Sequence, residues 1–293
     1  MLVSGASGLI GRALLLSFPQ ATEVVRLARG TSSGSGQVSW EPSAPLLPAA
    51  VSGFDAVVHL AGESVVGRWT NEKKSAIRES RVLGTRNLAA ALAQCEAKPR
   101  VFVCASAIGF YGDRGDEVLR EESASGRGFL SEVCREWEDA SQMAAEAGIR
   151  TVNMRTGLVL SVRGGALAKM LTPFKLGLGG RLGSGRQWMS WIHVDDMVGA
   201  IQHAMGIESL AGPVNLVGPD PVRNGEFTEV LASVLKRPAF FPVPEVALRA
   251  VFGRQAADEM FLASQRVRPG KLASSGYGFR FRELRAALED LVL

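Results

Sequence analysis

Three glycines near the start of the chain have the spacing of a turn that binds the phosphates of a dinucleotide. Gly5, Gly8 and Gly11 follow an apolar run at 1–3 and precede a helical-looking run at 13–16. In such a turn one glycine reverses the chain, one lets backbone amides approach a pyrophosphate, and one lets the helix pack close to the sheet. A flexible loop is the alternative, because a glycine triplet alone is weak evidence. The flanking runs favour the cofactor site, to which we assign Gly5, Ser7, Gly8, Leu9, Ile10 and Gly11.

A cationic residue stands where NAD and NADP sites differ. The run 23–29 is predicted as the second strand, and it ends at Arg29 with no carboxylate nearby. An NAD site usually places Asp or Glu there to hold the ribose 2′-hydroxyl, whereas a guanidinium binds a 2′-phosphate. The sequence therefore predicts NADP(H). Arg26 is the weaker candidate because strand alternation points it elsewhere, and a solvated charge is the alternative for either arginine.

Composition excludes several classes of protein. The 293 residues, 46% of them hydrophobic, suffice for one large domain or one domain with a smaller lobe. The net charge of +4 is spread among acidic neighbours, which argues against a nucleic-acid partner. No apolar run reaches the roughly 18 residues of a membrane span, and the first strand leaves no room for a signal peptide. Three widely spaced cysteines and three histidines suit a cytoplasmic protein without a metal site.

Predicted strands and helices alternate along the first 217 residues. Buried-type strands are expected at 54–60, 100–105, 150–155 and 214–217, with a short one at 38–40 inside an exposed excursion at 31–48. Helices are expected at 71–95 and at 129–147, the second ending at Gly148. This alternation predicts an α/β fold, a Rossmann-type doubly wound parallel sheet. We divide the chain into a dinucleotide-binding domain at 1–160, to which segments near 188–217 return, and a substrate lobe at 161–293 that includes a small C-terminal domain at about 240–293.

Five short motifs occur in one order along the chain. They are Gly5-x-x-Gly8-x-x-Gly11, His59-Leu60-Ala61-Gly62-Glu63, Ala105-Ser106-Ala107, Arg155-Thr156-Gly157 and Trp191-Ile192-His193-Val194-Asp195-Asp196. This order resembles the extended short-chain dehydrogenase/reductase superfamily. More closely, the chain is similar to the nucleoside-diphosphate-sugar-epimerase-like branch of atypical members, which carry a small C-terminal domain of unknown function. The resemblance implies NADP(H) contacts at Ala28, Arg29, Leu60, Ala61, Arg81 and Leu158, and we add Gly62 and Glu63 from the same motif.

The chain departs from the superfamily at its proton-transfer pair, Tyr-x-x-x-Lys. Neither Tyr111 nor Tyr277 has a lysine four residues later. If Glu138 aligns with the acidic residue that commonly follows the lysine by four, Leu130 stands in place of the tyrosine and Cys134 in place of the lysine. The lysine normally lowers the pKa of the phenol so that it can exchange a proton with the substrate, and this chain lacks that arrangement.

Ser106 and Tyr111 are the candidates for any remaining proton chemistry. Ser106 follows the fifth predicted strand, where its hydroxyl can bind a substrate oxygen or simply cap the strand. Tyr111 can replace the missing phenol only beside a positive group such as Arg114, and a packing or substrate-contact tyrosine is the alternative. Cys134 has no local base and is interpreted as a buried thiol. The face that carries Glu136 and Glu138 is expected to point to solvent.

The second half of the chain has weaker signals. Lys169, Phe174 and Lys175 lie in a stretch, 164–180, that either holds a nucleotide diphosphate or forms an amphipathic helix with a loop. Trp188, Trp191 and His193 are expected to line the same cleft. His193 is also interpreted as a helix-cap residue, because the two carboxylates that follow it fit a helix N-terminus.

These patterns predict an NADP(H)-binding epimerase or oxidoreductase. Its substrate is an unidentified small molecule, a nucleotide sugar being one candidate, and its chemistry starts with hydride transfer at the nicotinamide. The alternative is a catalytically weak module that senses NADP(H) or a sugar nucleotide and acts through a partner. The missing Tyr-x-x-x-Lys pair favours the module, and the complete phosphate turn favours the enzyme.

Overall fold

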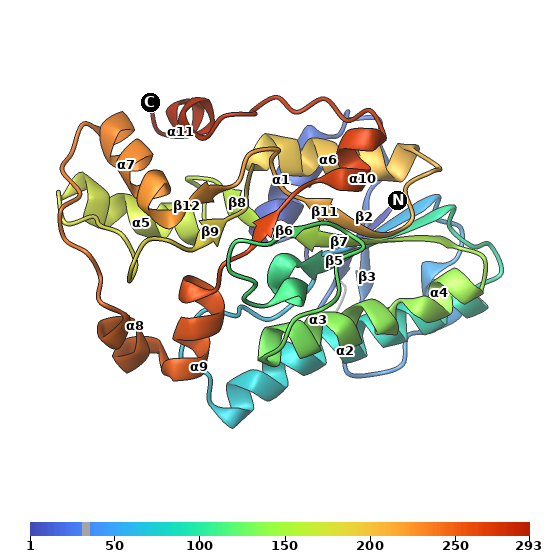
Figure 1. Ribbon diagram of the computed structural model, residues 1–293. Helices are drawn as coiled ribbons and strands as arrows, with labels where there is room; N and C mark the ends of the chain where they lie inside the picture. The colour runs from blue at the N-terminus through green and yellow to red at the C-terminus, as the bar shows by residue number, and fades with distance from the viewer. Residues whose placement is uncertain (31–35) are drawn as a thin grey trace.

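A seven-stranded parallel sheet forms the centre of the computed structural model, which describes residues 1–30 and 36–293. The strand order is β11-β7-β5-β4-β1-β2-β3, and every neighbouring pair is parallel (Figure 1). The predicted Rossmann-type sheet is therefore confirmed. Its strands are β1 (Leu2–Ser4), β2 (Val25–Ala28), β3 (Gln37–Ser39), β4 (Ala56–His59), β5 (Val101–Ala107), β7 (Arg150–Thr156) and β11 (Gly212–Leu216).

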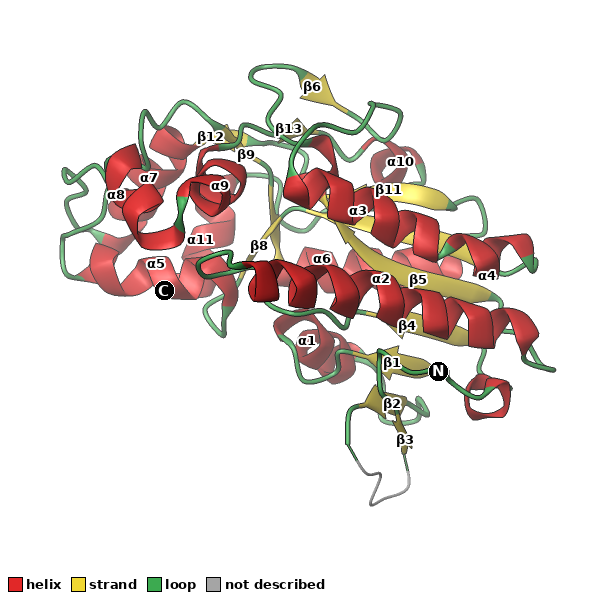
Figure 2. Ribbon diagram, turned by 90° about the horizontal axis from the view of Figure 1, so that it is seen from below, coloured by secondary structure: helices red, strands yellow, loops and turns green. Residues whose placement is uncertain are grey.

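Helices cover both faces of this sheet, because its strands are apolar on both sides. In β5, Val101 and Val103 face one core, whereas Phe102 and Cys104 face the other. Figure 2 shows α2 and α3 in front of the sheet, with α1 and α6 on the far side. The helices of the sheet faces are α1 (Leu9–Ser17), α6 (Val194–Gly206) and α10 (Gly270–Ser274) on one side, and α2 (Asn71–Gln94), α3 (Phe129–Ala140) and α4 (Gln142–Glu146) on the other.

The helix predicted at 129–147 is two helices in the structure. The break falls at Ser141, which is fully buried. Its hydroxyl donates to the carbonyl of Glu138 at 2.7 Å and lies 3.0 Å from Oδ1 of Asn153. A serine hydroxyl that binds its own helix backbone competes with the helical hydrogen bonds, which explains the interruption. The chain then turns at Gly148 with φ +86°, as the sequence indicated.

A second core lies beside the sheet, formed mainly by the part of the chain assigned to the substrate lobe, together with residues 158–160 and 191–193, which were assigned to the dinucleotide-binding domain. It joins β8 (Leu158–Leu160), α5 (Gly165–Lys175), β10 (Trp191–His193), α7 (Asn224–Leu235) and α11 (Leu284–Val292). Between them, α6 and β11 return to the sheet. The division at residue 160 stays a prediction. The remaining elements are the 3₁₀-helices Pro48–Val51 and Ile108–Tyr111, β6 (Val118–Leu119), β9 (Trp188–Met189), β12 (Val222–Arg223), α8 (Glu245–Phe252), α9 (Arg254–Ala257), the π-helix Asp258–Leu262 and β13 (Arg266–Val267).

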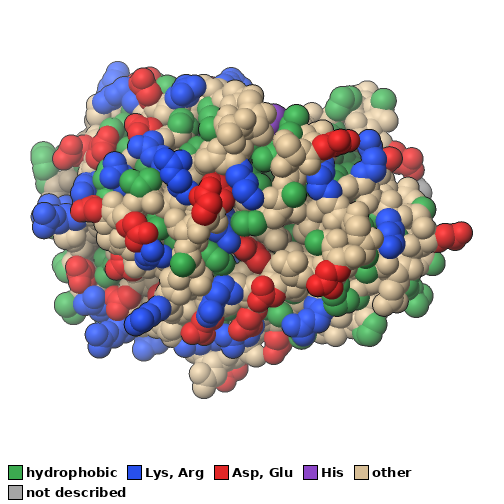
Figure 3. Space-filling model, turned by 45° about the vertical axis from the view of Figure 1, so that its right-hand side comes forward, with side chains coloured by type: hydrophobic (Ala, Val, Ile, Leu, Met, Phe, Trp, Pro, Cys, Tyr) green, Lys and Arg blue, Asp and Glu red, His purple; other side chains and the backbone are tan. Residues whose placement is uncertain are grey.

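The surface carries both signs of charge. On the face shown in Figure 3, Lys and Arg side chains are interspersed with Asp and Glu. Within the described parts of the chain, no helix combines the length and the apolar character that crossing a membrane requires.

Candidate functional site

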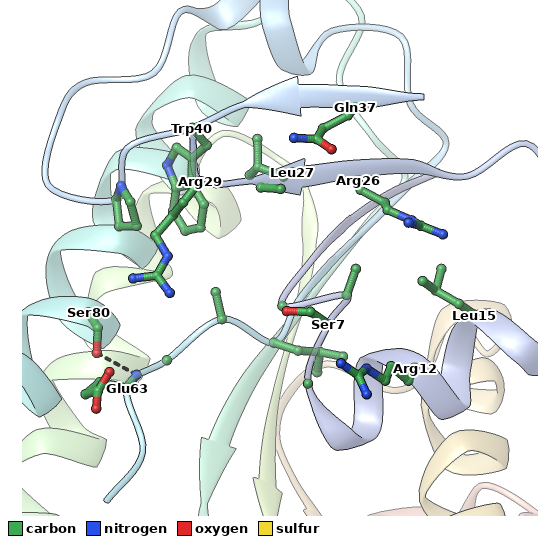
Figure 4. A pocket seen from close by; sticks show the side chains of 18 of the residues that line it. Ser7, Arg12, Leu15, Arg26, Leu27, Arg29, Gln37, Trp40, Glu63 and Ser80 are labelled. Carbon is green, nitrogen blue, oxygen red and sulfur yellow. Dashed lines mark hydrogen bonds between the residues drawn. The ribbon is translucent and has the colours of Figure 1, made fainter. Parts of the chain in front are cut away.

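A pocket of about 730 Å³ lies where β1, β2 and β4 end and α1 begins. Ligands of open parallel sheets bind outside these carboxyl ends of the strands. Figure 4 shows side chains from the β1–α1 turn, from the end of β2 and from the loop after β4 around one space. The structure brings together nine of the predicted cofactor residues in its lining: Gly5, Ser7, Gly8, Ala28, Arg29, Leu60, Ala61, Gly62 and Glu63.

The glycines of the turn meet different steric demands. Gly5 has φ +69°, and a Cβ there would lie 2.6 Å from the carbonyl carbon of Leu60. A Cβ on Gly11 would lie 2.3 Å from the carbonyl oxygen of Gly5, so α1 packs against the turn only because Gly11 has no side chain. Gly8 has an ordinary φ of −73°, and its Cβ would meet only that same oxygen, at 3.2 Å. Its expected role, leaving room for a pyrophosphate, stays a prediction.

Five predicted cofactor residues lie outside the lining of this pocket. Leu9, Ile10 and Gly11 form the first turn of α1, where a helix offers free backbone N–H groups. Leu158 packs against the second core. Arg81 lies behind the pocket wall, with its guanidinium 3.3 Å from the position of a Cβ on Gly62.

Arg81 holds the loop after β4 in place. Its guanidinium donates to the carbonyls of Glu63 at 2.8 Å and Ile77 at 3.1 Å, and lies over the ring of Trp137. Ser80, one residue earlier, accepts a hydrogen bond from the backbone N–H of Glu63 at 3.0 Å (Figure 4). The side chain of Glu63 accepts from Lys73 at 2.6 Å, and this hydrogen bond holds its pKa below the usual range. The loop is thus fixed from α2 before any ligand binds.

Sequence reasoning missed several residues that line the pocket. Arg12 directly follows the last glycine of the turn, and Trp40 and Pro42 lie within three residues after the edge strand β3. Arg26, the weaker of the two predicted arginines, also lines the pocket. The signal for Arg12 was present, because a residue in the first turn of α1 lies beside the phosphate turn. Trp40 gave no such signal, since its place depends on how the excursion at 31–48 folds back.

Ser4 and His59 hold the start of the loop after β4 in place through hydrogen bonds. The hydroxyl of Ser4 accepts from the N–H groups of Leu60 at 3.2 Å and Ala61 at 3.4 Å. Its own proton is therefore donated to Nδ1 of His59, 2.6 Å away, which leaves the imidazole proton on Nε2. Burial lowers the pKa of His59 to about 4, so the ring is neutral at physiological pH.

We expect His59 to make stability depend on pH. Its folded pKa of about 4 lies below its unfolded value of 6.5, so the unfolded chain binds the extra proton first. The stability is therefore complete above pH 6.5 and is lost as the pH falls toward 4, by about 3 kcal/mol in total. Urea denaturation of the wild type and of His59→Asn, which keeps an acceptor toward Ser4, measures the difference. Identical pH profiles for the two proteins would contradict this assignment.

Glu138 of α3 forms a buried ion pair with Arg155 of β7. From the sequence, Glu138 was expected to face solvent. That expectation is corrected: Glu138 is only 8% exposed. Its two carboxylate oxygens accept from Nε and Nη2 of Arg155, each at 2.8 Å, and Oε1 also accepts from the hydroxyl of Ser106 at 2.7 Å. Glu138 is buried because the guanidinium of Arg155 on β7, itself only 3% exposed, needs a counter-ion. Glu136 does face solvent and pairs with Arg78.

The structure does not bring Ser106 or Tyr111 to the pocket. Ser106 is 3% exposed and donates its proton to Glu138. Tyr111 is fully buried, donates to Oδ1 of Asn215 at 2.7 Å and accepts from Arg155 at 3.0 Å. The positive neighbour is thus Arg155 and not Arg114, yet burial is the larger effect and raises the pKa of the phenol. Both catalytic roles stay predictions, and in this arrangement both hydroxyls are buried and donate to protein acceptors.

The other candidate side chains have structural roles. Cys134 is buried, as predicted, and burial raises the pKa of its thiol to about 12. Trp191 and Phe174 are buried in the second core and do not line a cleft, whereas Lys169 and Lys175 are exposed, as an amphipathic helix requires. Trp188 is partly exposed and donates to Asp116.

His193 caps α6, as predicted, and does not line a cleft. Its Nδ1 accepts from the backbone N–H of Asp195 at 3.1 Å. The side-chain atoms of His193, Asp195 and Asp290 that could coordinate a metal ion lie within 4.8 Å of one another. Arg280 pairs with both carboxylates, at 2.9 and 3.7 Å, so the group is an ion-pair network in which a guanidinium already supplies the positive charge.

Comparisons with known proteins agree with this arrangement. A model of the NAD dependent epimerase/dehydratase family matches residues 1–217, and a model of the domain of unknown function DUF1731 matches 243–291. Epimerase family protein Mb2239 of Mycobacterium bovis is 42% identical over 289 residues, which cover 98% of this chain and 95% of that protein. The motif-based resemblance, including the small C-terminal domain, is therefore confirmed.

Two solved structures are similar to this chain over nearly its whole length. The crystal structure of human epimerase family protein SDR39U1 (isoform 2) with NADPH matches at TM-score 0.90 and 34% identity, covering 99% of this chain and 98% of that one. The nucleoside-diphosphate sugar epimerase of Corynebacterium glutamicum matches at TM-score 0.82 and 38% identity, covering 99% of this chain and 57% of that one. The chain therefore belongs to the NAD dependent epimerase/dehydratase family, is similar to the epimerase family proteins that include SDR39U1, and carries a DUF1731 domain at residues 243–291.

Proposed function

We propose that this chain binds NADP(H) in the pocket at the β1–α1 turn and acts on a small molecule as an epimerase or oxidoreductase. The observation that best supports this proposal is the positive charge of the pocket lining. Three arginines, Arg12, Arg26 and Arg29, line it, and Glu63 is the one carboxylate among its described lining residues. A cationic pocket beside a phosphate turn fits a cofactor with an additional phosphate. The similar human protein was crystallised with NADPH, which supports the proposal.

In this proposal, different residues of the chain bind different parts of the cofactor. The turn from Gly5 to Gly11 and the free N–H groups of α1 would hold the pyrophosphate. Ala28 and Arg29 at the end of β2 would hold the adenosine ribose and its 2′-phosphate, and the loop from Leu60 to Glu63 would form the opposite wall. When bound, the cofactor supplies or accepts a hydride at its nicotinamide ring. The substrate class in this proposal is a nucleotide sugar, as the name of the Corynebacterium relative suggests.

The buried hydroxyls favour a second candidate, a weakly catalytic module that senses NADP(H). Ser106 and Tyr111 donate their protons to Glu138 and Asn215 and are closed off from solvent. A general acid or base typically contributes about 10²- to 10⁴-fold to a rate, so turnover without one would be slower by that factor. Loss of NADPH absorbance on addition of a metabolite mixture supports the enzyme. Binding of NADPH without its consumption supports the sensor.

Arg29→Asp tests the cofactor preference. We expect NADPH to bind about 2 to 4 kcal/mol more weakly, because a charge-assisted contact is replaced by repulsion, while NADH keeps its affinity. Calorimetric titration of both cofactors measures this, and Arg29→Gln separates the lost contact from the added repulsion. Equal losses for NADH and NADPH would show that Arg29 does not bind the 2′-phosphate.

A further inference from the structure

Four large apolar side chains are exposed on two neighbouring segments near the second core. Leu176 and Leu178 follow α5, and Phe240 and Phe241 lie in the connection between α7 and α8. Phe240 is 80% exposed and Phe241 is 58% exposed, which is unusual for phenylalanine. Both segments lie at the left-hand end of the molecule in Figures 1 and 2, away from the seven-stranded sheet. We call these four side chains the apolar patch.

The backbone of the two segments holds the apolar patch in its exposed position. The N–H group of Phe241 donates to the carbonyl of Gly179 at 3.3 Å. A Cβ on Gly180 would overlap the carbonyl oxygen of Phe241, so the segments approach this closely only because residue 180 is glycine. Pro238 and Pro242 stand on either side of the two phenylalanines and restrict the backbone there. The exposure is therefore built into the fold.

The two segments carry positive charges and no negative ones. Residues 164–182 and 236–244 contain no Asp or Glu. Their five basic side chains are all exposed: Lys169, Lys175, Arg181, Lys236 and Arg237. Glu245, the first carboxylate after the second segment, is paired with Arg249 at 3.2 Å. Exposed apolar groups are thus combined with charge of one sign, which favours an anionic partner.

We infer that the apolar patch and its basic neighbours bind the surface of a membrane that contains anionic lipids. Phenylalanine and leucine side chains insert at the boundary between headgroups and acyl chains, while lysine and arginine attract the acidic headgroups. A second copy of this chain fits the patch less well, because a symmetric interface would place the basic side chains of one copy against those of the other. Such binding would be separate from the cofactor pocket, whose lining contains none of these residues.

Flotation of the full chain with lipid vesicles tests this surface. We expect the protein to bind vesicles of phosphatidylserine and phosphatidylcholine in equal parts, and to bind phosphatidylcholine alone at least about 10-fold more weakly. The double variant Phe240→Ser with Phe241→Ser should bind the mixed vesicles at least about 30-fold more weakly, because it loses the inserted apolar area. Lys175→Gln with Arg237→Gln should cost about 25-fold, since each basic side chain contributes roughly 5-fold.

Two control variants match these changes away from the apolar patch. Met143→Ser removes an exposed apolar side chain from α4, which lies at the other end of the molecule (Figure 1), and Arg86→Gln removes an exposed charge from α2. Both should leave vesicle binding within about 2-fold of the wild type. All replaced side chains are exposed, so circular dichroism should show the same folded protein throughout.

Several results would overturn the inference. A wild-type protein that binds neither kind of vesicle would leave the apolar patch to a protein partner. Equal binding of both kinds of vesicle, or equal losses in the patch variants and the controls, would show that the patch and its charges do not select the membrane. Sedimentation velocity without vesicles covers the remaining occupant: a wild-type dimer that the phenylalanine variant converts to a monomer would assign the patch to a second copy of this chain.

Discussion

Glu138→Ala is expected to lower the free energy of unfolding by about 3 to 5 kcal/mol, because it leaves the guanidinium of Arg155 buried without a counter-ion. The side chains of Arg155 and Glu138 are only 4% and 10% exposed, and they share two hydrogen bonds of 2.8 Å. Ser106 would also lose its acceptor. Urea denaturation at neutral pH measures the change.

Two comparisons separate the ion pair from a general effect of truncation. Glu136→Ala removes a carboxylate two residues away that is 44% exposed, and it should cost less than about 1 kcal/mol. The double variant Glu138→Leu with Arg155→Met replaces both charges by apolar groups and should recover most of the lost stability. If Glu138→Ala were no more costly than Glu136→Ala, the buried pair would not carry the stability that we assign to it.

The sheet was predictable because its signals are local. Strands such as β4 and β5 are short apolar runs, and β1, the turn and α1 follow one another without interruption. The turn and Arg29 were predictable for the same reason, since a phosphate turn and the end of the next strand meet in every sheet of this kind. Contacts between distant parts of the chain carried no such signal. Arg155 and Glu138 meet only after β7 has paired with β5 and α3 has packed on them.

The helical periodicity of α3 indicates that Glu138 faces the sheet. It follows Cys134 by four residues, and both face the sheet, together with Trp137. Reading the acidic residues of α3 as one solvent face ignored this spacing. The outcome affects the interpretation of the site, because the acceptor of the Ser106 proton is the buried carboxylate. On the same helix, Leu130 and Cys134 are an apolar residue and a buried thiol, and the ion pair of Glu138 with Arg155 is buried as well.

Gly8→Val is expected to weaken both NADPH and NADH by at least about 1,000-fold, or ~4 kcal/mol, while the protein stays folded. A valine there fills space that the pyrophosphate needs, and both cofactors share that group. The fold should tolerate the change because the backbone at Gly8 has an ordinary φ of −73° and a Cβ meets only the carbonyl oxygen of Gly5, at 3.2 Å. Gly5→Val is unsuitable, since a Cβ at Gly5 would clash with the backbone at Leu60.

Gly278→Val is the matched control, because no atom lies within 4 Å of its Cβ position and it lies outside the pocket lining. It should leave the affinities for both cofactors unchanged. Calorimetric titration of the three proteins, with circular dichroism to confirm folding, gives the answer. Together with Arg29→Asp, the result assigns each phosphate: loss of both cofactors marks the pyrophosphate site, and loss of NADPH alone marks the 2′-phosphate site. A folded Gly8→Val protein that still binds NADPH with full affinity would remove the turn from the cofactor site.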